Sequence, residues 1–348
     1  MRVRALIGAT LVGWALLPAL ALVASADEDP PLRAVDAGPP LRPPLTVLRA
    51  VERAPRTFAI SADASKKELI VLVGGYASRS NDETFDKFRE RLAEESGYHV
   101  VRFGQDLGAY DTFGEVDANA QRLRDSIRAV STSYDRVHIV THSMGGVVAD
   151  RAFALGLSAS DGVTTYVAWA APHDGAGAAQ ALQTTLTISG PARDDARAFT
   201  KAYFSRDPDT AAVRDLARAD PSGPQPGVVR LDLRLATDAL VSSADARDPG
   251  VASRVLLPTT LGELEGHGGI LQSEQAFDLT LATIRSRAVP PDERGRLLLA
   301  ASETVAQKVD GYAQLVLGGV CSVVLIGGIG GLFRRALRRT LAWPPISE

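Results

Sequence analysis

A serine that could act as a nucleophile lies at the end of an apolar run. Val137–Val140 is typical of a buried strand and leads through Thr141 into Ser143, which is followed by two glycines and an apolar, helix-like segment, 147–157. A sharp turn between strand and helix exposes the serine hydroxyl and strains its backbone. Gly145 leaves the space that such a turn needs, although Thr141 stands where the G-x-S-x-G pattern has its first glycine.

A serine hydroxyl is a poor nucleophile until a neighbouring base accepts its proton, and the chain has five histidines. His99 and His138 lie at or inside predicted strands that precede the serine. His142, in the turn itself, is expected to point away, and His173 comes before any strand that could present an acid. His267 remains, in a glycine-rich loop between the last predicted strand and the last predicted helix, and we interpret it as the base.

The base needs a carboxylate to orient it, and the acid is expected just after the strand 228–236. Asp238 lies two residues beyond that strand and is our first choice. Asp245 and Asp248, further along the same loop, are the alternatives. Asp232 lies inside the strand, where charged residues alternate with leucine, and is interpreted as part of a solvated face.

Negative charge that develops on a substrate oxygen requires two backbone N–H donors. One is expected from Met144, the residue after the serine. The other is expected from Tyr76, with Gly75 as the alternative, because the glycines after the strand 68–73 let the backbone approach a substrate.

Strands and helices alternate along the segment that must position these residues. Strands are predicted at 68–73, 99–103, 136–140, 164–171, 228–236 and 251–257. Helices are predicted at 84–96, 116–130, 144–157 and 273–287. Such alternation predicts an α/β domain with a mostly parallel sheet and helices on both faces.

Four motifs resemble those of α/β-hydrolases of the triacylglycerol lipase and esterase type. They are VTHSMGG at 140–146, APHDG at 171–175, TDALV at 237–241 and GHGGIL at 266–271. The resemblance covers about residues 68–287 and implies serine-dependent ester hydrolysis through an acyl-enzyme, without a metal or other cofactor. The chain departs from these lipases at Thr141 and at Gly74, which stands where they usually have histidine.

The hydrolase domain is expected to span 56–288, with a helical cap at about 175–226 that contains enough apolar residues to line an acyl site. A connecting segment, 289–312, follows it. A proline-rich linker, 27–55, precedes it. The cap is interpreted either as a lid or as a solvated helical decoration.

Both ends of the chain are apolar. Residues 1–26 combine two arginines, an apolar run and an A-x-A site, which is typical of a secretory signal, with an uncleaved anchor as the alternative. Residues 313–333 are long enough for a transmembrane helix, and the arginines of the tail 334–348 favour a cytoplasmic location for it. The sequence therefore predicts an extracytoplasmic domain held at the cell membrane by its C-terminus.

The composition limits the other functions. The net charge of −3 favours no nucleic-acid partner, and the single cysteine excludes an intramolecular disulfide and a cysteine-based metal site. We expect a hydrolase of lipid or other acyl esters, with no particular oligomeric state predicted. An acyltransferase or thioesterase with the same three side chains, and a non-catalytic binding protein with this fold, remain the alternatives.

Overall fold

The computed structural model describes residues 68–78, 85–93, 95, 97–187, 209–264, 266–292, 294 and 298–312. Its sheet has six strands in the order β2-β1-β3-β4-β5-β6, and every neighbouring pair is parallel. The strands are β1 (Glu68–Val73), β2 (Tyr98–Arg102), β3 (Arg136–His142), β4 (Val163–Trp169), β5 (Val229–Leu235) and β6 (Ala252–Leu256). The predicted parallel α/β architecture is thus confirmed, and the strands lie within a few residues of their predicted bounds.

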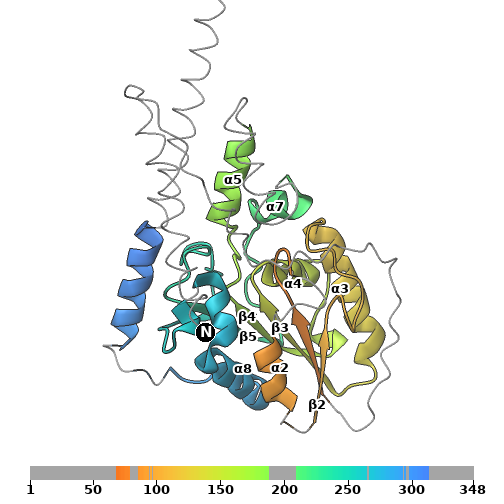
Figure 1. Cartoon of the computed structure of the whole chain (residues 1–348). Coiled ribbons are helices and arrows are strands. Elements are labelled where there is room, and N and C mark those ends of the chain that lie inside the picture. Colours follow the sequence, from red (N-terminus) through yellow and green to blue (C-terminus); the bar gives the residue numbers. More distant parts are fainter. Residues whose placement is uncertain are drawn as a thin grey trace, which may run out of the picture.

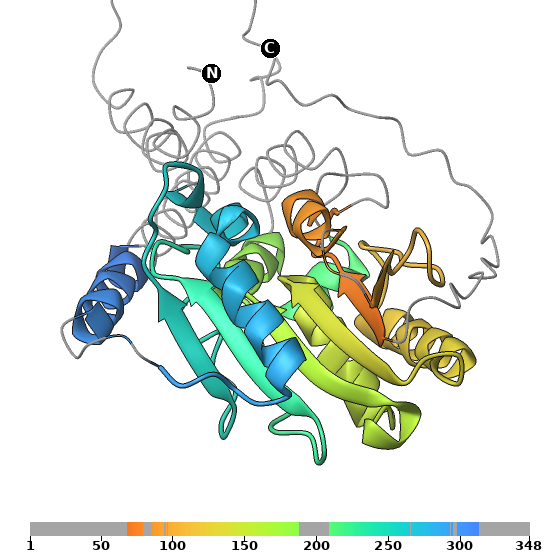
Figure 2. The ribbon, with the colours of Figure 1, turned by 90° about the horizontal axis from the view of Figure 1, so that it is seen from below.

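Helices cover both faces of this sheet (Figures 1 and 2). They are α2 (Asp86–Ala93), α3 (Val116–Ser131), α4 (Met144–Ala154), α5 (Gly177–Thr187), α7 (Ala211–Leu216) and α8 (Glu274–Ser286). Short 3-10 helices follow at η1 (Ala159–Asp161), η2 (Gly262–Leu264) and η3 (Gly266–Gln272). The α2 helix is shorter than the predicted helix 84–96.

Two separate apolar cores lie on the two faces, and β1 contributes to both. Val71 and Val73 pack with α3 and α4, whereas Ile70 and Leu72 pack with α2 and α8. Alternate side chains of a strand point to opposite faces, so a strand between two helical layers must be apolar throughout. This explains why the strand is continuously apolar rather than alternating.

The candidate cap is described in part. The α5 and α7 helices lie within 175–226, and residues 188–208 between them are outside the described residues. A further helical stretch covers 298–312, within the predicted connecting segment. Its Asp310 accepts a hydrogen bond from the backbone N–H of Ser243 at 3.0 Å and pairs with Arg234 at 3.5 Å, which attaches this stretch to the sheet domain.

The predicted signal or anchor (1–26), linker (27–55), membrane helix (313–333) and tail (334–348) lie outside the described residues. Within the part of the chain that is described, no helix is both long and apolar enough to span a bilayer.

Candidate active site

Ser143 occupies the turn between β3 and α4, and its backbone is strained. Its φ of 56° and ψ of −129° lie in a region that residues with a side chain rarely adopt. The backbone N–H of Ser143 donates to the carbonyl of Trp169, at the end of β4, at 2.9 Å. The tight turn that the sequence predicts is present, and the serine side chain is only half-buried.

Glycines allow three chain segments to meet at this turn. A Cβ added to Gly145 would lie 2.3 Å from the carbonyl oxygen of Val73 and 2.6 Å from that of Gly74. A Cβ on Gly146 would lie 2.3 Å from the side chain of Ala171. No side chain fits at these distances, so the helix after Ser143 can pack against the ends of β1 and β4 only with glycine at both positions.

Asp238 and His267 are brought together from positions 29 residues apart. The Nδ1 atom of His267 lies 2.9 Å from Oδ2 of Asp238. The other oxygen of Asp238 accepts the backbone N–H groups of Leu240 and Val241, each at 3.0 Å. Burial opposes ionisation of Asp238, but His267 and the bond from Val241 outweigh it and hold the pKa of Asp238 below its usual value.

The other ring nitrogen of His267, Nε2, is buried and has no hydrogen-bond partner among the described residues. Because Asp238 accepts at Nδ1, the Nδ1–H tautomer is favoured, and Nε2 then carries a free lone pair. A half-buried imidazole with one nitrogen fixed and the other without a hydrogen bond in the described part of the chain, even to Ser143, is suited to accept a proton. The glycine-rich segment that carries it forms the 3-10 helix η3.

His142 connects His267 to the turn that carries the serine. The two imidazole rings lie 4.9 Å apart between centroids, and Nε2 of His142 lies 3.3 Å from the carbonyl oxygen of His267. Burial, followed by the nearby His267, lowers the pKa of His142 to about 3, so this ring is neutral. The expectation that His142 points away is wrong, because it packs on the candidate base.

The alternative acids have other partners. Asp245 accepts the backbone N–H groups of Ser242, at 3.1 Å, and Gly177, at 3.3 Å, and so joins the loop after β5 to the start of α5. Asp248 pairs with Arg230 at 2.7 Å. Of the three candidates, Asp238 is the one that the structure places against His267.

The loop after β1 lies against the serine. A Cβ added to Gly75 would be 2.7 Å from the Cβ of Ser143. Tyr76 follows, with its ring edge-on to Phe113 at 5.2 Å between centroids. Met144, the other expected donor, is the first residue of α4, where backbone N–H groups have no partner within the helix. Both segments that could supply oxyanion donors therefore adjoin the serine.

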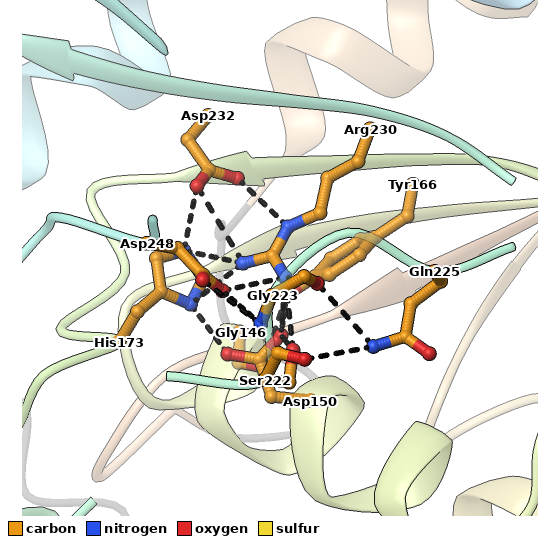
Figure 3. A network of polar contacts seen from close by, with 10 residues as sticks. All are labelled: Gly146, Asp150, Tyr166, His173, Ser222, Gly223, Gln225, Arg230, Asp232 and Asp248. Atoms are coloured by element: carbon orange, nitrogen blue, oxygen red, sulfur yellow. Dashed lines mark hydrogen bonds and ion pairs between the residues drawn. The ribbon is translucent and has the colours of Figure 1, made fainter. Parts of the chain in front are cut away.

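A buried polar network, absent from the sequence-based prediction, joins α4 to β5 and to the segments after β4 and β5 (Figure 3). Asp150 of α4 contacts His173 at 2.5 Å, and His173 lies 3.4 Å from Asp232. Arg230 pairs with Asp248 and, at 3.3 Å, with Asp150. Asp232 is only 6% exposed, so its assignment to a solvated face is wrong. The features of the sequence that could have indicated this network are the APHDG motif and the charged residues within β5.

The charges of this network indicate a structural role. Burial opposes protonation of His173, but Asp150 and Asp232 outweigh it and raise the pKa of His173 to about 10. Asp150, His173 and Asp248 lie close enough to hold a metal ion, but the guanidinium of Arg230 already pairs with both of these carboxylates. A cation would compete with it, and the arrangement instead joins α4 to the segments after β4 and β5.

One family model matches part of the chain. Residues 63–188 match the family described as PGAP1-like alpha/beta domain. This segment includes the serine and the loop after β1, whereas Asp238 and His267 lie beyond it. No curated protein matches the chain.

Several solved structures are similar to this chain at low sequence identity. Lipase B of Aspergillus fumigatus is 17% identical, with a TM-score of 0.46, and the match covers 77% of this chain and 66% of the lipase. For Bacillus licheniformis lipase BlEst2, the identity is 14%, the TM-score 0.44, and the coverage 65% of this chain and 93% of the lipase. For a thermophilic esterase of Thermogutta terrifontis, the identity is 14% and the TM-score 0.42, and the match covers 64% of this chain and 91% of the esterase.

The six-stranded parallel sheet and the match to a PGAP1-like alpha/beta domain over residues 63–188 agree with the α/β architecture that the resemblance implies.

Proposed function

We propose that the protein is a serine hydrolase that cleaves carboxylic esters, with lipid or other acyl esters as substrates. The observation that carries the proposal is the state of His267. One ring nitrogen is hydrogen-bonded to the buried Asp238, and the other has no partner among the described residues. The ring also packs on His142, the residue before the strained Ser143.

In the proposed reaction, Ser143 Oγ attacks the ester carbonyl while Nε2 of His267 takes the hydroxyl proton. Asp238 stabilises the imidazolium that forms. The N–H groups of Met144 and Tyr76 stabilise the oxyanion, and the tetrahedral intermediate collapses as His267 returns the proton to the leaving alcohol. Water, deprotonated by His267, then attacks the acyl-enzyme and releases the carboxylic acid.

The preference for acyl substrates rests on the apolar side chains beside the loop after β1. Tyr76 and Phe113 stack edge to face there. The cap, of which α5 and α7 are described, would cover the acyl chain. We further propose that residues 313–333 tether the domain to the cell membrane, so that it acts outside the cytoplasm on esters at the membrane surface.

The test is a series of p-nitrophenyl esters from acetate to palmitate, with the full-length chain in detergent. The Ser143→Ala variant is expected to lower kcat/KM by about 10³-fold or more, because the nucleophile is absent. Ser133→Ala is the matched control, because Ser133 is exposed at the end of α3, and it should retain full activity. A folded wild-type protein that hydrolyses no member of the series would contradict the proposal and favour a binding protein.

The same site could pass its acyl group to another alcohol or act on a thioester. Adding an alcohol acceptor to the assay distinguishes these reactions. Predominant formation of a new ester, rather than the free acid, would make the protein an acyltransferase. Faster turnover of the matched thioester would make it a thioesterase.

A further inference from the structure

The loop that should stabilise the oxyanion fixes part of its own backbone, because the N–H of Ser78 donates to the carbonyl of Gly75 at 3.2 Å. Gly74 and Gly75 follow β1 directly and have no side chains. Glycine is the residue with the greatest backbone freedom. An oxyanion donor is effective only when it is already aimed at the place where charge develops. The bond from Ser78 holds the Gly75–Tyr76 peptide, so the Gly74–Gly75 peptide needs a separate contact to hold it.

Tyr110 makes that contact from another part of the chain. It lies in the segment between β2 and α3, and its hydroxyl donates to the carbonyl oxygen of Gly74 at 2.8 Å. Burial, followed by the charge of Asp111, raises the pKa of Tyr110 far above its ordinary value. The hydroxyl therefore keeps its proton and remains a donor at any pH at which the protein would work.

A bond to this carbonyl also fixes the direction of the next N–H group. The carbonyl of Gly74 and the N–H of Gly75 belong to one planar peptide unit, and in a trans peptide they point in opposite directions. The described residues contain no cis peptide bond. Gly75 lies directly against Ser143, and Gly145 packs against the same carbonyl. Tyr110 thus holds the peptide that adjoins both the serine and the start of α4.

The tyrosine is itself held in place. Its ring lies 5.1 Å from that of Phe103 between centroids. Gly104, with φ +91°, makes room for it, because a Cβ there would lie 2.6 Å from the Cβ of Tyr110. The segment after β2 therefore presents the hydroxyl from a packed position.

We propose that Tyr110 is a positioning residue for oxyanion stabilisation, which acts by holding the Gly74–Gly75 peptide beside Ser143. This inference rests on the proposed hydrolase function. It assigns to Tyr110 no contact with the substrate, only the orientation of the Gly74–Gly75 peptide, which carries the alternative donor, Gly75 N–H, and directly precedes the Tyr76 N–H.

The test compares Tyr110→Phe with Tyr98→Phe in the full-length protein. Both variants lose one phenolic oxygen and keep the ring, and Tyr98 lies on the edge strand β2, outside the proposed machinery. Removing an oxyanion donor costs about 10²–10³-fold in kcat. Loosening one donor should cost less, so for Tyr110→Phe we expect a fall in kcat of about 10-fold, with KM within about twofold of wild type.

A second readout separates this role from a general loss of packing. A trifluoromethyl ketone forms a hemiketal with the serine, and its oxyanion needs the same donors. Its inhibition constant should weaken in Tyr110→Phe by the same factor as kcat/KM. Replacement of Tyr110 by 3-fluorotyrosine, which keeps the hydroxyl, should restore both values.

The outcomes distinguish this inference from the function on which it rests. If the wild-type protein neither hydrolyses esters nor binds the ketone, the proposed function fails and the inference fails with it. If the wild type is active but Tyr110→Phe matches Tyr98→Phe in kcat and in ketone affinity, only the role of Tyr110 is refuted. If Tyr110→Phe does not fold, the fluorotyrosine variant decides, because activity far below wild type with the hydroxyl present would refute the inference.

Discussion

Replacing Asp238 by asparagine should reverse the proton arrangement of His267. At present one carboxylate oxygen accepts the N–H groups of Leu240 and Val241, and the other accepts Nδ1–H of His267 at 2.9 Å. The single amide oxygen of asparagine would keep the two backbone donors. Its NH₂ group would then face Nδ1, which could only accept. The proton would move to Nε2, the nitrogen that must be free to take the serine proton.

The expected cost follows from this change of tautomer. A triad whose acid becomes an asparagine loses about 10⁴-fold in kcat, which corresponds to about 5.4 kcal/mol of transition-state stabilisation. KM should change little, because Asp238 is 1% exposed and has no access to the substrate. The assay is steady-state hydrolysis of the best p-nitrophenyl ester, with circular dichroism as the check on folding.

Asp245→Asn is the matched control for this experiment. Asp245 lies in the same loop and accepts two backbone N–H groups, which the amide oxygen can still do, so kcat should stay within about threefold of wild type. A folded Asp238→Asn variant with less than about a tenfold loss of kcat would refute the triad. So would a larger loss for Asp245→Asn than for Asp238→Asn.

Three further results are expected. Gly75→Ala should lower kcat/KM by at least about tenfold, because its Cβ would press on the serine, whereas Gly311→Ala, in open space, should be neutral; equal activities would contradict the packing at the turn. His142→Phe should lower kcat by about 3- to 10-fold with KM retained, since the ring would still pack but the hydrogen bond to the base loop would be lost; unchanged kcat would rule out a positioning role. The raised pKa of His173 stabilises the folded state fully below pH 6.5, and this contribution is lost as the pH rises towards about 10. The free energy of unfolding measured in urea should therefore fall over this pH range, and in His173→Gln it should be lower and depend less on pH. The same pH dependence in the variant as in the wild type would contradict protonation in the network.

The sequence was sufficient for much of the fold and for the pairing of two candidate residues. Apolar runs with β-branched residues predicted the strands, because a strand between two helical layers is buried throughout. The pairing of Asp238 with His267 followed from the order of strands, since the loops at the carboxyl ends of parallel strands meet at one edge of the sheet. The small residues around Ser143 predicted the tight turn, because such a turn leaves little space for side chains.

Contacts between distant segments could not be predicted in this way. The sequence predicts that His142 points away, but its side-chain direction depends on how η3 returns over the sheet. The sequence favours a solvated position for Asp232 because charges alternate with leucine in β5, a pattern that an exposed face and a buried ion network share. Tyr110 carries no motif at all, and its role depends on the path of the segment after β2.

The most direct measurement is the site of covalent labelling by a fluorophosphonate in the full-length protein, mapped by mass spectrometry of its peptides. We expect a single adduct on Ser143, formed much more slowly in the His267→Ala variant, because the hydroxyl is nucleophilic only beside its base. An adduct on another serine, or a folded wild-type protein that forms none, would contradict the assignment of Ser143 as the nucleophile.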